Sequence, residues 1–466
     1  MSTRITFNGI DVTSGEYLTP PVDAEDLARL VLDRPLEDVD EERWRLFLVD
    51  DEKAALRDGH DPKNLTEAGW GVLFAEGADP AVEQALEPLI SLRRKQVDND
   101  GRFRILRGEQ GFRSGDSKIQ FLKRSGVTPA GPVDPDTMPY YLLIVGSPAE
   151  IPFEFQYSLD VAYAVGRLDF DDVSGYRHYA ESVVNSEDNQ SSDVRTGFFG
   201  TAHPNDPATQ MSAEGLVQAL ATAIGERAPE VAVDHRAPEA STKAALGDLL
   251  GDSGAPRLAF TATHGLGAPA GHADQQALQG ALVCQDWPGP GNPMGSQHYF
   301  AASDLSPAAD YGSLIAFLFA CYGAGTPQLD DFPGLDRSQP RSLANAPFVG
   351  ALPKALLSHE AGAALAVVGH VDRAWTYSFD WPGVGSQTAI FEDTLLRLLD
   401  GYPIGYAMEM FNERHAELAV DLNESEGLVG TADQLTAYEV AGLWTAKNDS
   451  RNYTLLGDPA VRLVSA

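Results

Sequence analysis

The chain has 466 residues, and its 43% hydrophobic and 22% charged residues are typical of a soluble globular protein of two or three domains. Its formal net charge of −34 argues against nucleic acid or an anionic membrane as a partner, because both attract basic surfaces. A solvated acidic surface explains the charge most simply, although part of the acidity could attract a basic substrate.

The cysteine content and the N-terminal sequence favour a reducing cytoplasm as the compartment of this protein. Cys284 and Cys321 are the two cysteines, which is too few for a disulfide framework in a chain of this length. The first residues lack the apolar segment of a secretory signal, and no stretch approaches the roughly 20 apolar residues of a membrane span. We therefore expect a cytoplasmic protein with reduced thiols and no membrane association.

The first part of the chain is polar and acidic. Residues 23–32 carry apolar side chains at helical spacing, and residues 41–57 form a second predicted helix. Residues 1–65 are therefore predicted to be a mostly helical N-terminal extension that packs on the body of the protein. These residues allow a regulatory pro-segment but do not demand one.

The next part of the chain mixes strand and helix signals. Residues 68–74 and 139–146 are apolar runs typical of buried strands, and residues 160–168 are predicted to be another strand. Helices are predicted at residues 80–95 and 176–185, irregular structure at residues 98–131 and a linker at residues 185–193.

Strands and helices alternate after the linker. Strands are predicted at residues 196–200, 231–234, 257–263, 279–283, 314–320 and 363–369, and helices at residues 212–224, 242–250, 387–401 and 405–418. Nearly continuous apolar strands that alternate with helices predict an α/β fold, with a mainly parallel sheet covered by helices on both faces.

Two reactive side chains follow strands of this predicted sheet. His264 comes directly after the strand at residues 257–263, Cys321 after the strand at residues 314–320, and a glycine lies close behind each. Open α/β sheets place their chemistry at the carboxyl ends of the strands. An imidazole there can take the proton of a thiol and produce a thiolate nucleophile, and glycines let a substrate carbonyl approach backbone N–H groups.

An inert role for these side chains is the alternative. Cysteine is among the most buried residue types, so a lone Cys321 would more often be structural than reactive. His370 is a rival base, because it also ends a predicted strand at this edge, but it follows the cysteine in the chain.

The two segments resemble the caspase–gingipain clan of cysteine peptidases. In that clan a strand ending in His-Gly precedes a strand ending in Ala-Cys, as in residues 258–265 (LAFTATHG) and 317–325 (FLFACYGAG). The 57 residues from His264 to Cys321 are close to the spacing of about 50 in caspases. Further segments that resemble the gingipain catalytic region or the caspase-like CHAT branch lie at residues 140–146, 164–168, 280–287, 302–305, 401–406 and 453–463.

The resemblance covers residues 65–466 and implies both a fold and an activity. It implies a caspase-like sheet at residues 195–466, preceded by a smaller α/β lobe at residues 66–190. Cys321 would be the nucleophile and His264 the general acid/base of an endopeptidase that forms a thioester acyl-enzyme. The backbone N–H groups of Gly265 and Cys321 would form the oxyanion hole. The implied substrate is a protein or peptide, and the resemblance implies neither a cofactor nor a metal ion.

The substrate pocket is predicted less directly. Clan members that cut after arginine use an aspartate before the strand that matches residues 164–168, and Asp160 is the nearest candidate. Further candidates at this edge are Asp286, Asp330, Asp331 and, as a pocket wall, Trp287. A buried carboxylate would bind a guanidinium through two hydrogen bonds, whereas a solvated carboxylate or a packed tryptophan would serve no pocket. The caspase pentapeptide around the cysteine is absent, so a basic residue at the cleaved position is preferred to aspartate.

Two functions of different classes are therefore expected. The first is a cysteine endopeptidase, which the resemblance allows to be latent until triggered, as in effectors of defence or cell death. Residues 1–65 or a loop at residues 328–342 could hold it inactive, and a regulatory partner would fit such a role. The alternative is a catalytically silent caspase-like scaffold that binds a protein partner, although the presence of both His264 and Cys321 counts against it.

Overall fold

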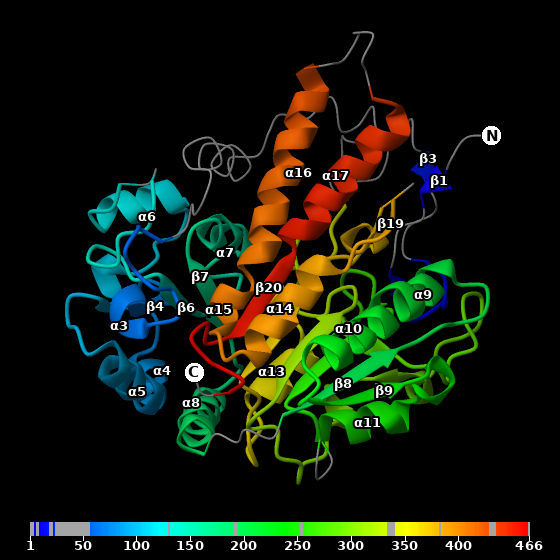
Figure 1. The fold of residues 1–466 in the computed structure, drawn as a ribbon, viewed down its shortest axis with the longest axis horizontal. Coiled ribbons are helices and arrows are strands. Elements are labelled where there is room, and N and C mark those ends of the chain that lie inside the picture. Colours follow the sequence, from blue (N-terminus) through cyan, green and yellow to red (C-terminus); the bar gives the residue numbers. More distant parts are fainter. Residues whose placement is uncertain are drawn as a thin grey trace.

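The structure is a computed structural model that describes residues 4–5, 9–17, 22–23, 56–128, 131–189, 194–251, 255–332, 341–381, 384–427 and 435–464. Figure 1 shows a central sheet with helices packed against it, and the long helices α16 (Glu409–Gly427) and α17 (Ala437–Arg451) extend beyond the sheet. The predicted helices at residues 23–32 and 41–57 fall outside the described residues apart from their terminal positions.

Ten strands form the central sheet, in the order β5-β4-β6-β7-β20-β17-β14-β10-β8-β9. They are β4 Trp70–Phe74, β5 Phe103–Leu106, β6 Tyr141–Val145, β7 Ala164–Leu168, β8 Arg195–Gly200, β9 Ala232–Arg236, β10 Leu258–Ala262, β14 Ile315–Phe319, β17 Ala366–His370 and β20 Tyr453–Gly457. Every residue of β10, β14 and β17 is buried, so both faces of the sheet are covered there. The predicted α/β fold with a mainly parallel sheet is confirmed.

Helices precede or follow most of these strands. Besides α16 and α17 they are α3 Leu65–Ala68, α4 Pro80–Ala85, α5 Glu87–Val97, α6 Lys118–Arg124, α7 Phe153–Asp160, α8 Val173–Asp188, α9 Pro207–Ser212, α10 Ala219–Arg227, α11 Lys243–Gly251, α12 Gln275–Leu278, α13 Ala351–Leu357, α14 Ala389–Leu399 and α15 Ile404–Ala407. A π-helical segment, Ala213–Gln218, joins α9 to α10. Within the described ranges no helix combines the length and the apolar character that crossing a bilayer requires.

The direction of the strands decides which residues share an edge of the sheet. Neighbouring strands are parallel except β17 and β20, which are antiparallel. The carboxyl ends of β8, β10, β14 and β17 therefore lie at the same edge as the amino ends of β20 and β7. Because β7 pairs with β20, the strands of residues 66–190 and of residues 195–466 share one sheet. The division into two units stays a prediction.

Several local predictions were wrong. Residues 160–168 are not one strand, because Pro152 opens α7, which ends at Asp160 before β7 begins. Residues 98–131, predicted to be irregular, contain β5 and α6. The Ser117 hydroxyl and the Gln120 side chain each bond the other residue's backbone N–H, and this reciprocal cap starts α6.

The mostly helical N-terminal extension stays a prediction, because most of its residues lie outside the described ranges, although short strands and turns form its described part. Three short strands lie there, namely β1 Arg4–Ile5, β2 Ile10–Asp11 and β3 Val22–Asp23. β1 pairs with β3, and β2 pairs in parallel with β11 (Leu266–Gly267), which begins two residues after His264. The helix predicted at residues 212–224 also begins earlier, at Pro207, because proline suits the first turn of a helix.

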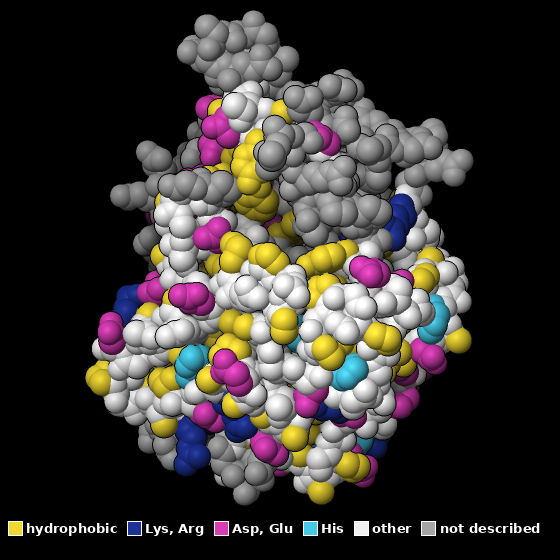
Figure 2. Space-filling model, turned by 90° about the vertical axis from the view of Figure 1, so that its right-hand side faces the viewer, with side chains coloured by type: hydrophobic (Ala, Val, Ile, Leu, Met, Phe, Trp, Pro, Cys, Tyr) yellow, Lys and Arg dark blue, Asp and Glu magenta, His cyan; other side chains and the backbone are white. Residues whose placement is uncertain are grey.

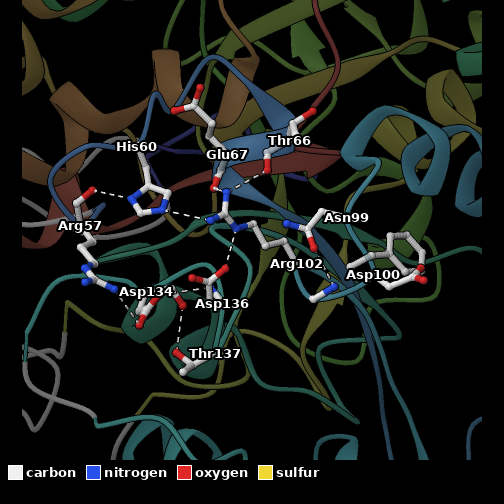
Figure 3. Close-up of polar contacts among 12 residues, drawn as sticks. Arg57, His60, Thr66, Glu67, Asn99, Asp100, Arg102, Asp134, Asp136 and Thr137 are labelled. Carbon is white, nitrogen blue, oxygen red and sulfur yellow. Dashed lines mark hydrogen bonds and ion pairs between the residues drawn. The ribbon is translucent and has the colours of Figure 1, made fainter.

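A polar cluster fixes the segment before β4 to the first edge of the sheet. Figure 3 shows the Arg102 guanidinium pointing between this segment and the turn that carries Asp136. Arg102 Nε donates to Asp136 Oδ1 at 2.7 Å, and its Nη1 donates to the carbonyls of Thr66 and Glu67 at 3.0 and 3.2 Å. His60 Nε2 lies 3.3 Å from Arg102 Nη2. One arginine thus connects three segments that are distant in sequence.

A buried ion pair joins the C-terminal segment to the helices of the first half. Arg93 on α5 donates from Nε to Asp458 Oδ2 at 2.6 Å. A terminal nitrogen of the same guanidinium lies 2.6 Å from Glu187 Oε1 on α8. Trp70 Nε1 donates to the other oxygen of Asp458 at 2.9 Å. Asp458 and Arg93 are almost fully buried, so neither charge can turn to water instead.

Asp458→Ala is expected to destabilise the protein by about 3–5 kcal/mol, because it leaves the Arg93 charge and the Trp70 N–H buried without this partner. Urea unfolding of the wild type and the variant measures the difference. The matched control is Asp171→Ala, whose carboxylate is 89% exposed and pairs with Lys354, with an expected loss of about 0–1 kcal/mol. Equal losses in both variants would contradict the structural role of Asp458.

Candidate active site

The register of the sheet brings His264 and Cys321 together. Ala262 at the end of β10 is the pairing partner of Phe319 at the end of β14, and each reactive residue follows two positions later. Gly265 packs so closely on the backbone of Cys321 that an added Cβ would lie 1.8 Å from the Cys321 carbonyl oxygen. Gly265 must therefore be glycine for the two strand ends to approach in this way.

A small cavity lies between the two side chains. Its volume is about 20 Å³, which is room for about one water molecule and not for a peptide side chain. The side chains of His264 and Cys321 are 3% and 2% exposed. The cavity is lined by Ala208, Thr209, Ser212, Thr263, His264, Phe319, Cys321, Ala374 and Thr376. The structure therefore holds this site in a closed form.

Asp206 holds the imidazole of His264 by one nitrogen. Nε2 of His264 lies 2.5 Å from Oδ2 of Asp206, and the aspartate is fully buried. Burial raises the pKa of Asp206, but the charge and the hydrogen bond of His264 lower it further, to about 2. The carboxylate is therefore ionised at neutral pH, and Nδ1 is the imidazole nitrogen that does not bind it.

Sequence reasoning missed Asp206. It lies in the loop that follows β8, immediately before Pro207, and Asn205 turns the chain there with a φ of 60°. A signal was present, because this polar loop follows a buried strand at the same edge as His264 and Cys321. The side chain reaches His264 through the loop and not through strand register, so periodicity could not identify it.

Aromatic rings pack around the imidazole of His264. The ring centroids of Trp287 and Tyr17 lie 6.4 and 6.2 Å away, both edge-on, and the ring of His203 stacks at 6.4 Å. Burial lowers the pKa of His203 to about 4, so this second imidazole is neutral, and its Nε2 lies 3.1 Å from the carbonyl of Cys284. These rings limit the positions that His264 can take.

The thiol of Cys321 is protected in this closed form. Burial raises its pKa to about 12, against the smaller opposing influences of the Ala374 backbone and Arg373. The Ala374 N–H points at Sγ at a distance of 3.4 Å, and Sγ lies 3.8 Å from the Ala374 carbonyl oxygen. The thiol is therefore protonated at neutral pH.

The backbone N–H of Gly265 does not pair with the neighbouring strand. Two hydrogen bonds of 2.9 Å flank the bridge between Gly265 and Leu282: Val283 N–H donates to the His264 carbonyl, and Leu266 N–H donates to the Ala281 carbonyl. The N–H of Gly265 therefore points away from β12 (Leu282–Val283). The roles of Gly265 and Cys321 as oxyanion donors stay predictions.

The predicted pocket residues do not line the cavity. Asp160 ends α7 and accepts a hydrogen bond from Val165 N–H at 3.2 Å, three strand spacings (about 14 Å) along the sheet from Cys321. Asp286 caps α11 by accepting from Lys243 N–H at 2.6 Å. Trp287 is buried, with its ring edge-on to that of His264. A substrate pocket formed by these three residues therefore stays a prediction without support from the cavity.

The acidic side chains after β15 (Gly325–Thr326) are paired with arginines of the same chain. Asp330 receives two hydrogen bonds from Arg373, at 2.6 and 3.0 Å, and Asp331 lies 2.6 Å from Arg451. Asp372 is buried beside Arg373, and burial holds its pKa well above the usual range. In the closed form these carboxylates therefore already interact with arginines of the same chain.

The rival residues belong to other environments. His370 is fully buried, and its Nε2 lies 3.1 Å from Asp449 Oδ1, so it does not line the cavity. Cys284 is also buried, with Sγ 3.5 Å from the carbonyl oxygen of Leu282. The geometry thus favours His264 over His370 as the partner of Cys321.

No protein-family model matches the sequence, and no curated protein sequence matches it. A solved structure of a protein named only as a protease aligns with 87% of this chain and 80% of its own, at 13% identity and a TM-score of 0.46. A chain of the Saccharomyces cerevisiae separase–securin complex aligns with 72% of this chain and 16% of its own, at 10% identity and a TM-score of 0.31. In a second crystal structure of that complex the values are 68%, 15%, 8% and 0.30.

Proposed function

We propose that the chain is a cysteine endopeptidase of the caspase–gingipain clan, gingipain-like or CHAT-like, that uses a Cys321–His264 pair. The observation that carries the proposal is the in-register placement of both side chains in one cavity, with an ionised carboxylate on Nε2 of the histidine. A structural cysteine needs neither a facing histidine nor a buried carboxylate behind that histidine.

The proposed reaction has two steps. In the first, His264 takes the thiol proton, Sγ of Cys321 attacks the carbonyl carbon of the substrate, and the oxyanion lies on the N–H groups of Gly265 and Cys321. His264 then gives its proton to the departing amine, which leaves a thioester on Cys321. In the second step His264 takes a proton from water, the resulting hydroxide cleaves the thioester, and the proton returns to the thiolate.

Latency is part of the proposal. The cavity accommodates about one water molecule, so α9 on one side and the 3₁₀ turn η6 (Thr376–Ser378) on the other must separate before a peptide can enter. Cleavage in the predicted loop at residues 328–342, or a regulatory partner, would be the trigger. Residues 333–340 of this loop lie outside the described ranges.

A few large hydrophobic side chains are exposed on the described surface. Among the described residues, the exposed large hydrophobic side chains are Met211 on α9, Leu329 after β15 and Val384 next to β19 (Gly385–Ser386). Figure 2 shows hydrophobic side chains that gather on the upper part of the described surface, between dispersed acidic ones. A protein or peptide substrate with a basic residue at the cleaved position remains the proposed substrate class.

Thiol labelling and turnover of a peptide library test the proposal together. Iodoacetamide at neutral pH is expected to leave Cys321 unmodified in the intact protein, because burial raises its thiol pKa to about 12. Conditions that start peptide turnover, such as limited proteolysis of the loop, should make Cys321 react while Cys284 stays unmodified. The cleaved bonds then show whether a basic residue precedes them.

Each result separates the parts of the proposal. Immediate labelling and full turnover by the intact chain would rule out latency. Cleavage after acidic or apolar residues would remove only the basic specificity. A chain that never turns over peptides and whose Cys321 titrates as an ordinary thiol after loop cleavage would favour the catalytically silent scaffold.

A further inference from the structure

The N-terminal segment at residues 9–17 is attached directly behind the catalytic histidine. β2 pairs in parallel with β11, and Val12 N–H donates to the Gly267 carbonyl at 3.0 Å. β11 begins two residues after His264, so the two segments are coupled at that point. Ile10 is fully buried in a small apolar cluster that also contains Leu266 and Trp287.

A tight turn brings the chain back from β2 toward the site. Asp11 Oδ1 accepts the N–H groups of Thr13 and Ser14 at 2.7 and 3.0 Å, and Gly15 has a φ of 69°. An added Cβ at Gly15 would lie 2.1 Å from the carbonyl oxygen of Asn292, so the turn is seated closely on the body of the protein. The result is an antiparallel bridge between Ile10 and Tyr17.

Tyr17 completes the contacts of the carboxylate that holds His264. Its hydroxyl donates to Asp206 Oδ1 at 3.3 Å, while Asp206 Oδ2 binds His264 Nε2 at 2.5 Å. The Tyr17 ring also meets the His264 ring edge-on, at 84°. Burial and the charge of Asp206 raise the pKa of Tyr17, so the hydroxyl stays protonated and acts as the donor. Both carboxylate oxygens are thus fixed, and the carboxylate cannot rotate freely.

We propose that Tyr17 is a positioning residue for the His264–Asp206 pair. Residues 9–17 are then a part of the catalytic unit and not an inhibitory segment. This inference rests on the proposed function of Cys321 and His264. An inhibitory segment would cover the thiol. Tyr17 is not among the residues that line the cavity at Cys321, and its hydroxyl is directed at Asp206.

Tyr17→Phe in the full chain is expected to lower kcat about tenfold and to change KM by less than about twofold, because a hydrogen bond to a charged group is lost outside the substrate cavity. Tyr17→Ala should lower kcat further, since the ring contact is lost too. The far-downfield proton resonance of the His264–Asp206 hydrogen bond should shift in Tyr17→Phe without any substrate present. Tyr299→Phe, in the same apolar cluster, is the matched control and should leave kcat and the resonance unchanged.

The outcomes separate this inference from the proposed peptidase function. A higher kcat in Tyr17→Phe would show an inhibitory segment and overturn the inference. Unchanged kcat together with an unshifted resonance would also overturn it, while leaving the peptidase function intact. If the wild type shows no peptidase activity, the resonance alone decides: a shift in Tyr17→Phe supports the positioning role, and no shift overturns it.

Discussion

Cys321→Ala is expected to reduce peptide turnover by roughly 10⁴–10⁶-fold, because the variant has no nucleophile to form the thioester and retains only substrate binding and the oxyanion donors. The substitution removes one sulfur atom from a cavity that accommodates about one water molecule, so the fold should tolerate it. Turnover of the best library peptide by the triggered protein measures the effect, and active-site titration of the wild type normalises it.

Cys284→Ala is the matched control for this prediction. Both cysteines are buried, and each follows a strand of the chain. The Cys284 thiol lies outside the cavity, and burial raises its pKa strongly. Turnover by Cys284→Ala should stay within about twofold of the wild type, since the substitution touches no reacting atom. Retention of more than a tenth of the turnover by Cys321→Ala would exclude the proposed nucleophile.

The placement of Cys321 and His264 could be predicted because strand register controls it. Their strands are continuous apolar runs, which identified them as buried and parallel, and each reactive residue follows its strand at the same distance. The glycines were also informative, since the close contact of Gly265 with the Cys321 backbone excludes any side chain. Apolar runs and period-2 alternation in a sequence thus identify where strands end and which residues follow them.

The other contacts of the candidate site depend on loops and on chain topology, which apolar and period-2 sequence patterns do not predict. Asp206 and Tyr17 reach His264 through turns, and Tyr17 comes from a segment 247 residues earlier in the chain. The C-terminal strand β20 enters the middle of the sheet in the antiparallel direction. That direction places the amino end of β7 at the edge of the sheet that carries His264 and Cys321, although three strand spacings separate Asp160 from Cys321. Local sequence does not encode such long-range pairings.

Asp206→Asn is expected to lower kcat by roughly 10⁴-fold, because the loss of a carboxylate behind a catalytic histidine removes both its charge and its control of the tautomer. The carboxylate accepts from Nε2 of His264, so Nδ1 is left free to take the thiol proton. The asparagine NH₂ group can donate to Nε2 instead, which would force the proton onto Nδ1. Since the pKa of Asp206 is about 2, its charge is present throughout the neutral range, and the loss should be seen across that range.

The size of this loss also decides between a catalytic and a structural role for the pair. Asparagine is nearly isosteric with aspartate, so a purely structural pair would mainly lose stability, and turnover per folded molecule would stay close to the wild type. Asp304→Asn is the matched control, because that carboxylate accepts from Ala301 N–H and pairs with Lys243 outside the cavity, so the substitution should leave kcat unchanged. Equal kcat values for the two variants would mean that Asp206 does not act on the proton transfer. A large loss in Asp206→Asn, a smaller loss in Tyr17→Phe and no loss in the control would support a carboxylate that stays ionised and orients His264 for proton exchange with Cys321, held in place by a loop and by the N-terminal segment.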